Sequence, residues 1–473
     1  MCPVGSQSQE HQVGSGTADV GKSVVKGEFV FYKRDIINFL FVISFPIYGI
    51  GTYISGAKSP IAGFVVSISA HLLIILFYFI DILYKKEFQI KANRYFILTW
   101  VYMVTCIVSL FRALSNNLPE DNLPMTIAKC FLVVTPIHAF IIVALYNEDQ
   151  EGRLPKLAFI SLSLLLLINM IGFYGLGLAN EIHSIDGRVN FPFLDGFYSG
   201  ACVLAILNLM IIYYMSKCLD NPFRLSYLGA YFMFNLALLF MINSRINILI
   251  FLFVALLLAF KLIEKTRGLF AGSLFTVPIL LNSGMILYQI LSLPFFVSIL
   301  KRVDIEDVTT FNGRAFIWRN AMNWLTEGQQ GIWLGNGYKG HYFLGLISDV
   351  AKLWNSDIRD YHHLHLHSTS FEILVCQGIV GFAIYMILFY QLFVYYRKKY
   401  RNGDEMGIYF AVGVFLLFIL EVDTFVYLES SGSVIFALLL SNVLITHPSK
   451  ERAHPPDTRY PPVIHPVTLA NHA

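Results

Sequence analysis

Charged residues are scarce in this sequence. Only 14% of its 473 residues are Asp, Glu, Lys or Arg, whereas 56% are hydrophobic. Ordinary soluble domains are about one quarter charged, because their surfaces need those groups. The composition therefore excludes a soluble protein. No basic face recurs along the chain, so no nucleic-acid partner is expected.

Cysteines are also few, and they are badly placed for cross-linking. Four of the six fall inside apolar runs, and the other two lie in segments expected on the cytoplasmic side: Cys106, Cys130, Cys202 and Cys376, then Cys2 and Cys218. No disulfide framework is therefore available on the outer face. The first 25 residues lack the apolar core of a signal peptide, and we expect a cytoplasmic tail there.

Long apolar runs are what the sequence has in abundance. A helix needs about 20 residues to cross a hydrocarbon core of about 30 Å, and most of the runs are near that length. They predict an all-α polytopic membrane protein of about twelve transmembrane helices. The expected spans are 36–54, 60–84, 95–113, 125–146, 157–179, 196–215, 225–242, 246–260, 268–296, 370–396, 406–427 and 431–446.

The distribution of Lys and Arg predicts the orientation of these spans. With both termini in the cytoplasm, 22 of the 34 lie on the inner side, 11 on the outer side and one, Lys129, within a span. Seven of the outer residues belong to a single long loop, which counts for little in the positive-inside rule. The short loops alone therefore favour this orientation.

The predicted spans divide the chain into five regions. A disordered cytoplasmic tail (1–35) precedes helices 1 to 9 (36–300), and helices 10 to 12 (370–446) precede a second cytoplasmic tail (447–473). Between helices 9 and 10 lies one large exterior loop, 301–369. A loop of this length inside a compact protein indicates function, so we expect it to carry the active site.

Three arginines are expected on the outer side near the membrane surface. Arg245 opens an apolar run there, where the positive-inside rule disfavours arginine. An ionisable group at this depth indicates function, although an arginine whose side chain reaches back to the interface is the structural alternative. Arg188, in the loop before residue 196, is by itself a solvated loop charge, and Arg314 is the third.

The loop segment 312–325 begins with Asn-Gly-Arg314 and has Trp318 one turn later. Its apolar residues recur at helical spacing and predict an amphipathic helix on the membrane surface: Phe316, Ile317, Ala321, Trp324 and Leu325. Gly335 and Gly337 follow in a Leu-Gly-Asn-Gly stretch. This stretch predicts a tight turn and leaves open a backbone site for an anion.

Four histidines lie near the end of the loop: His362, His363, His365 and His367. Imidazole is a common zinc ligand, but no carboxylate or thiol follows at a characteristic spacing, and the alternation also fits a partly buried strand. A histidine beside arginines at the mouth of a membrane helix is better suited to proton transfer or to hydrogen bonding a substrate. We therefore expect no metal and no cofactor.

In their order and spacing, these motifs resemble the O-antigen ligase and polymerase superfamily of membrane glycosyltransferases. The resemblance covers about residues 180–395. It rests on Arg188-x-x-x-Pro192, Ser244-Arg245, Gly313-Arg314 with Trp318, Gly335-x-Gly337, and His367 eleven residues before Gly378-x-x-Gly381. The family commonly has Asn after the histidine, where this chain has Ser368. The three additional histidines leave open which one is active, and the spacing to Gly378 favours His367, with His365 second.

The resemblance implies a GT-C-like enzyme of the bacterial cytoplasmic (inner) membrane. Such enzymes transfer a glycan from undecaprenyl diphosphate to a sugar hydroxyl at the outer face, without a metal. The implied partners are the lipid-linked oligosaccharide, a glycan or lipid A-core acceptor, and membrane lipid. Catalysis falls to His367, Arg245 and Arg314, and substrate contacts fall to Arg188, His365, Trp318, Gly335 and Gly337.

Within that family the segment 367–381 favours a polymerase of O-antigen or exopolysaccharide repeat units. An O-antigen ligase is the alternative, followed by a protein O-oligosaccharyltransferase. A transporter or flippase for a lipid-linked glycan would also use outer arginines, but it needs a continuous polar path, and the spans contain few charges. A zinc-dependent membrane hydrolase is disfavoured because the histidines lack further ligands at characteristic spacing.

The orientation is testable by cysteine-accessibility labelling in intact cells. Single cysteines placed at 340–360 should react with an impermeant reagent from outside, because the large loop is expected there. Single cysteines at 85–94 should react only after the membrane is opened. Labelling of positions 85 and 86 in intact cells would overturn the orientation and the placement of the active site.

Overall fold

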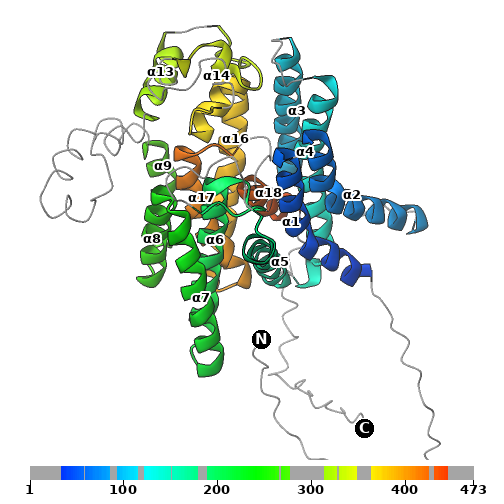
Figure 1. The fold of residues 1–473 in the computed structure, drawn as a ribbon, viewed down its shortest axis with the longest axis vertical. Coiled ribbons are helices and arrows are strands. Elements are labelled where there is room, and N and C mark those ends of the chain that lie inside the picture. The colour runs from blue at the N-terminus through cyan, green and yellow to red at the C-terminus, as the bar shows by residue number, and fades with distance from the viewer. Residues whose placement is uncertain are drawn as a thin grey trace, which may run out of the picture.

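The structure is a computed structural model. It describes residues 33–57, 59–85, 93–115, 122–150, 152–178, 189–265, 268–276, 314–327, 330–348, 364–425 and 431–445. Its α-helices, shown in Figure 1, are α1 Lys33–Ala57, α2 Pro60–Lys85, α3 Arg94–Leu114, α4 Leu123–Tyr146, α5 Arg153–Met170, α6 Gly196–Lys217, α7 Pro222–Ile242, α8 Arg245–Ala259, α9 Leu269–Leu274, α13 Arg314–Thr326, α14 Gly340–Phe343, α16 Thr369–Arg401, α17 Ile408–Val422 and α18 Ser431–Leu444. Short helical turns add Glu148–Gln150, Ile171–Gly175 and Glu405–Gly407.

Among the described residues, nine helices are long and apolar enough to cross a membrane. Two more, α8 and α18, are apolar but only 15 and 14 residues long. Eleven of the twelve predicted spans coincide with these helices. The other, 268–296, is described only through residue 276, so the number twelve stays a prediction. The all-helical class is confirmed, and the nine long apolar helices are compatible with a polytopic membrane protein.

Ion pairs gather at one end of the bundle, which we call the charged end. They join the start of α1 to α2, α4 and α5, and the turn after α16 to its neighbours. The pairs are Lys33–Asp81, Lys85–Asp81, Arg34–Asp149, Arg153–Asp35, Lys156–Glu405 and Lys399–Asp404. Because successive helices reverse direction, α6 and α16 begin, and α3 and α17 finish, at the opposite end.

We call that opposite end the His367 end. There Ser109, near the end of α3, donates a 3.0 Å hydrogen bond to the carbonyl oxygen of Cys376 in α16. The ring of Tyr198, near the start of α6, lies against that of His367, just before α16. In Figure 1, α13 and α14 lie beside the upper part of α16, so the described parts of the predicted exterior loop cover this end.

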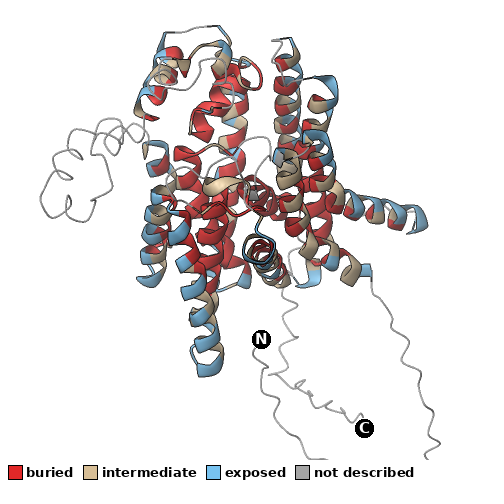
Figure 2. Ribbon diagram, viewed as in Figure 1, coloured by how far each residue is buried: buried red, intermediate tan, exposed pale blue. Residues whose placement is uncertain are grey.

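Helix α17 forms the centre of the bundle. Nearly all of its residues are buried, whereas α7 leaves most of its surface exposed. Buried residues concentrate in the middle of the molecule, around α6, α16, α17 and α18 (Figure 2). The perimeter is apolar, and the exposed hydrophobic side chains of α2 illustrate it: Leu72, Leu73, Leu76, Phe79, Ile80 and Leu83.

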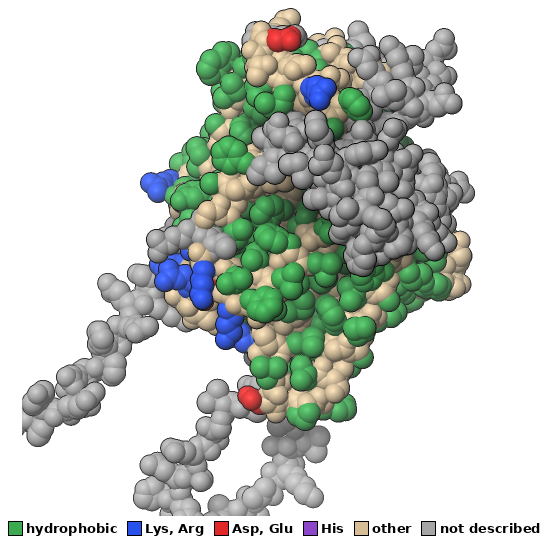
Figure 3. Space-filling view, turned by 90° about the vertical axis from the view of Figure 1, so that its left-hand side faces the viewer, with side chains coloured by type: hydrophobic (Ala, Val, Ile, Leu, Met, Phe, Trp, Pro, Cys, Tyr) green, Lys and Arg blue, Asp and Glu red, His purple; other side chains and the backbone are tan. Residues whose placement is uncertain are grey.

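Hydrophobic side chains also cover much of the face shown in Figure 3, where the few charged side chains lie toward its margins. A perimeter of this kind is unfavourable in water and fits the hydrocarbon of a bilayer.

One predicted span differs from the structure. The sequence predicts an uninterrupted helix over 370–396, but α16 is broken at Gly378, which has φ 74° and ψ −175°. A loop from the exterior segment, Gly331–Gly337, fits into the break and pairs with the backbone on both sides of it. Four hydrogen bonds join them: Asn336 N to Val375 O (2.8 Å), Gly337 N to Cys376 O (3.1 Å), Ile379 N to Ile332 O (2.8 Å) and Val380 N to Trp333 O (3.3 Å).

The break should tolerate only glycine. A Cβ at Gly378 would collide with the carbonyl oxygen of Trp333, and the positive φ adds strain. We expect Gly378→Ala to lower the free energy of unfolding by about 2–4 kcal/mol, measured by thermal unfolding in detergent. Gly229→Ala is the matched control, since a Cβ there, in the middle of α7, meets nothing within 4 Å. Equal stability of the two variants would contradict the description of the break.

Candidate functional site

Arg314 is buried at the His367 end although it opens a helix of the predicted exterior loop. Only 5% of it is exposed. Its Nη1 donates a 2.5 Å hydrogen bond to the carbonyl oxygen of Val422, the last residue of α17, and its guanidinium carbon lies 5.1 Å from the ring centre of Tyr198. A helix C-terminus and an aromatic face both attract a cation. These contacts hold the charge of Arg314 in a fixed place.

The helix that begins with Arg314 is amphipathic, as predicted, but it does not use its apolar face as predicted. The buried side chains of α13 are Arg314, Ile317, Trp318, Ala321 and Trp324, whereas Phe316 is 41% exposed. Helical spacing predicts that Phe316 lies toward the membrane surface, and that contact stays a prediction. The face is covered by the protein instead of the membrane surface, because Trp318 is fully enclosed and donates from Nε1 to the carbonyl oxygen of Leu366 at 3.0 Å.

His367 lies between charged and aromatic groups just before α16. Its ring centre is 6.2 Å from that of Tyr198 and 5.7 Å from that of His365, and its Nδ1 is 4.0 Å from a carboxylate oxygen of Asp423. Burial, followed by the positive charge of Arg314, lowers the pKa of His367 to about 4, while Asp423 acts in the opposite direction. The imidazole is therefore neutral at pH 7 and able to accept a proton.

The backbone of His367 is strained. Its φ of 49° lies in the left-handed region, which costs a non-glycine residue of order 1–3 kcal/mol. Such a conformation persists only where the surroundings determine it. On its C-terminal side the next residue, Ser368, caps α16 by accepting from the backbone N–H of Phe371, and Thr369 donates from both N and Oγ1 to the carbonyl oxygen of Asp423 at 3.0 and 2.8 Å.

Asp423 and Glu421 bring acidic groups to the same place. Asp423 follows the last turn of α17 and is 4% exposed. Within the described part of the chain, its Oδ2 and the Nδ1 of His367 are buried without a hydrogen-bond partner. Glu421 accepts from the hydroxyl of Ser370 at 2.9 Å. The sequence motifs did not point to Asp423, Glu421 or Tyr198.

Arg245 lies at the His367 end but in a different setting. It is the first residue of α8, and its side chain is exposed, with no hydrogen bond or ion pair to the described residues. A cation in the first turn of a helix is unfavourable next to the positive end of the helix dipole. Arg188 lies outside the described residues, although its neighbour Val189 donates to the carbonyl oxygen of Met241, four residues before Arg245.

Gly335 and Gly337 lie in the loop that enters the break in α16. Both have positive φ, 73° and 88°, and a Cβ at Gly335 would collide with the carbonyl oxygen of Cys376. Arg112, at the end of α3, donates to the carbonyl oxygen of Gly335 at 2.5 Å. These glycines form a turn, as predicted, and their conformation is required by packing. Substrate contact by either one stays a prediction.

The histidine run is described only in part. His362 and His363 lie outside the described residues. The segment from Leu364 to His367 is an irregular chain and not a strand, with the side chain of His365 exposed and that of His367 14% exposed. The structure thus brings His365 and His367 together with Arg314, Trp318 and Asp423, whereas Arg245 is at the same end without a contact to them.

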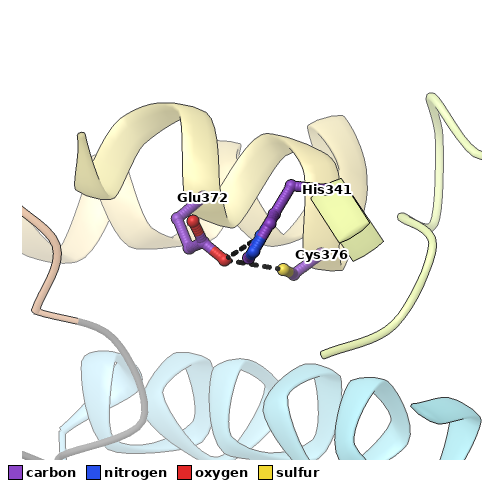
Figure 4. A group of neighbouring side chains, drawn as sticks. All are labelled: His341, Glu372 and Cys376. Atoms are coloured by element: carbon purple, nitrogen blue, oxygen red, sulfur yellow. Dashed lines mark hydrogen bonds and ion pairs between the residues drawn. The ribbon is translucent and has the colours of Figure 1, made fainter. Parts of the chain in front are cut away.

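A second buried group lies beside this segment. His341, Glu372 and Cys376 point toward one another (Figure 4), and their ligand atoms lie within 4.8 Å of one another. This is the one group of described residues with the donor types and spacing of a metal site. No sequence motif indicates this group, because His341 is 31 residues from Glu372 and is not part of the histidine run.

A scan of the chain against protein-family models finds no match, and a search of curated proteins finds none either. Assignment of a function therefore rests on the residues and their geometry.

The pKa of His367 predicts the pH dependence of the reaction that it serves. Because the neutral ring is the competent base above about pH 4, the acidic limb of kcat/KM should lie near pH 4–5, well below the ordinary histidine value of about 6.5. The free energy of unfolding should fall as the pH drops from about 6.5 to about 4, since the unfolded chain binds a proton near pH 6.5 that the folded chain binds only near 4. A limb at pH 6.5 would show that His367 is not the base in this environment.

Proposed function

We propose that this protein is a membrane glycosyltransferase that moves a glycan from undecaprenyl diphosphate to a sugar hydroxyl at the outer face of the membrane. The product we favour is a polymer of O-antigen or exopolysaccharide repeat units. The observation that supports the proposal most directly is the buried, fixed charge of Arg314 next to the neutral imidazole of His367. A cation and a base side by side are what glycosyl transfer from a lipid diphosphate requires.

The leaving group sets the first requirement. As the bond between the anomeric carbon and the diphosphate oxygen breaks, the electron pair goes to the diphosphate, which gains negative charge. A guanidinium already held in place stabilises that charge without reorganising, and it can hydrogen bond two phosphate oxygens at once. Arg314 supplies such a group. Arg245, beside the positive N-terminus of α8, offers a second positive region for the same diphosphate.

The attacking hydroxyl sets the second requirement. Its proton moves to the neutral ring of His367 while its oxygen forms the new bond to the anomeric carbon. The carboxylate of Asp423, on the Nδ1 side of the ring, then stabilises the imidazolium. Trp318 and His365 keep the role of substrate-binding residues. Trp318 holds the segment before α16 through its bond to Leu366, and His365 offers an exposed ring next to His367. Each step moves protons and charge, and none requires a metal or cofactor.

The placement in the membrane belongs to the same proposal. With both termini cytoplasmic and twelve spans, the charged end faces the cytoplasm and the His367 end faces outward, in a bacterial inner membrane. The ion pairs at the charged end support this orientation, since basic residues are enriched on the cytoplasmic side. Arg188 and the residues of 301–313 would then lie on the outer side too.

The reaction products separate the competing functions. Purified protein in liposomes with an undecaprenyl-diphosphate oligosaccharide should release undecaprenyl diphosphate and lengthen the glycan. Release only when lipid A-core is added would identify a ligase. Movement of the intact lipid-linked glycan across the bilayer without bond cleavage would identify a transporter. Activity should persist in EDTA, because arginines supply the charge.

Binding of the diphosphate by Arg314 and Arg245, which we call the diphosphate clamp, is tested by Arg314→Lys. Lysine keeps the positive charge but lacks the planar fork that binds two phosphate oxygens. We expect turnover to fall roughly 10²-fold or more, about 2.7–4 kcal/mol, as for the loss of one preorganised donor. Arg245→Lys should also lower turnover. The measurement is release of undecaprenyl diphosphate per folded protein.

Arg319→Lys is the matched control. Arg319 lies on the same helix, but its side chain is exposed on the opposite face, so its replacement should leave turnover unchanged. Thermal unfolding of each variant separates a loss of chemistry from a loss of folding. Near-normal turnover of both Arg314→Lys and Arg245→Lys at normal stability would rule out the diphosphate clamp.

A further inference from the structure

The buried group of Figure 4 is not used by the proposed chemistry. Nδ1 of His341, from α14, lies 2.8 Å from Oε1 of Glu372 in α16, and the thiol of Cys376, one turn later, lies 3.4 Å from the same oxygen. All three side chains are buried, and His341 is 1% exposed. Buried ionisable groups are costly unless they are paired and hydrogen bonded, so a group of this kind needs an explanation.

The other hydrogen bonds of the His341 and Glu372 side chains go to one segment of backbone. Nε2 of His341 lies 2.8 Å from the carbonyl oxygen of Leu364, and the backbone N–H of Leu366 donates to Oε2 of Glu372 at 3.2 Å. Trp318 bonds the carbonyl oxygen of Leu366 from the other side. The backbone groups of Leu364 and Leu366, which alternate with His365 and His367, are therefore held in place by hydrogen bonds.

The protons of the pair can be assigned from its partners. A carbonyl oxygen only accepts, so Nε2 of His341 carries a hydrogen for Leu364. Glu372 faces three donors, namely the imidazole, the Leu366 amide and the Cys376 thiol, which is the environment of an ionised carboxylate. His341 and Glu372 are thus joined by a hydrogen bond, with both ring nitrogens and both carboxylate oxygens engaged.

A metal ion in this place is disfavoured by the same geometry. Histidine, glutamate and cysteine are zinc ligands, each about 2.0–2.3 Å from the ion, so two ligand atoms around a tetrahedral zinc are roughly 3.3 Å or more apart. The separation of Nδ1 and Oε1, at 2.8 Å, is that of a hydrogen bond. A shared proton, and not a cation, therefore lies between them.

We infer that His341 and Glu372 are positioning residues that hold the segment Leu364–His367, and with it the strained backbone of His367, in the arrangement that places its ring beside Arg314 and Asp423. This inference rests on the proposed function for its effect on turnover. The positioning itself does not, because it can be measured on the backbone. On the C-terminal side the bonds of Thr369 to Asp423 complete the support.

The test compares Glu372→Gln with Glu372→Leu in the full-length protein. Glutamine offers an oxygen to the Leu366 amide and an N–H₂ to a neutral His341, so the support survives without charge. Leucine leaves the amide of Leu366 and Nδ1 of His341 without partners. The measurement is hydrogen exchange followed by mass spectrometry of a peptide covering 364–371. Its amide hydrogens should exchange at least tenfold faster in the leucine variant than in the original protein. In the glutamine variant they should exchange at the rate of the original protein.

Turnover and its pH profile give the second readout. In Glu372→Leu, kcat should fall roughly 10- to 100-fold with little change in KM, and Glu372→Gln should restore it to within a few-fold. The acidic limb should also move up toward pH 6.5, because a released His367 becomes hydrated and moves away from the charges that face it. Those groups are Arg314 and His365, which lower its pKa, and Asp423, which raises it.

Asn147→Ala is the control for a general loss of stability. Asn147 is buried and forms a 2.7 Å hydrogen bond to Asn38, which lies near the start of α1 toward the charged end. This variant should unfold more easily but keep the exchange of 364–371 and the acidic limb. If Glu372→Leu does not accumulate, His341→Phe keeps the ring volume, removes both ring nitrogens and should give the same faster exchange.

Two results would overturn the inference. One is unchanged exchange of 364–371 in Glu372→Leu or His341→Phe. The other is one equivalent of zinc in the purified protein that is lost from either variant, which would make the group a metal centre. Failure of the glycosyltransferase assignment looks different, since it would abolish the turnover readout in the unmodified protein while leaving the exchange result intact.

Discussion

The carbonyl oxygens at the C-terminal end of α17 accept the hydrogen bonds that hold the candidate site together. The last residues of a helix leave carbonyl groups without intrahelical partners, and in a buried location these must be satisfied. Here Arg314 bonds to Val422 and Thr369 bonds to Asp423, which joins the exterior helix α13 and the start of α16 to one place. Because nearly all of α17 is buried, it gives this junction a rigid base.

The transmembrane helices were largely predictable because hydropathy is a local property. The expected spans 60–84, 95–113 and 125–146 agree with α2, α3 and α4 to within two residues at each end. The predicted span 370–396 coincides with α16, but it does not include the break in the backbone at Gly378. Hydropathy cannot show such a break, because it depends on a loop some 40 residues earlier whose backbone supplies the missing hydrogen bonds.

The candidate site was predictable by residue type but not by contact. Sequence motifs selected His367 and Arg314, and the structure places them together. They did not select Asp423 or Tyr198, whose proximity arises only when α6 and α17 pack. His341 was missed for the same reason, since its partner Glu372 belongs to another helix. The amphipathic helix α13 was predicted, but the burial of Arg314 was not, because periodicity treats an arginine as a surface residue and cannot foresee its helix-end partner.

The closeness of Arg314 and His367 links donor binding to proton transfer within the proposed reaction. Burial, and after it the guanidinium, lower the pKa of His367, so the ring is neutral but a weak base. A bound diphosphate would place negative charge against Arg314 and offset the part of the shift that the arginine causes, while the part caused by burial would remain. The pKa of His367 would then rise, and the ring would become a stronger base. The same arginine would thus hold the leaving group and strengthen the base when the donor binds.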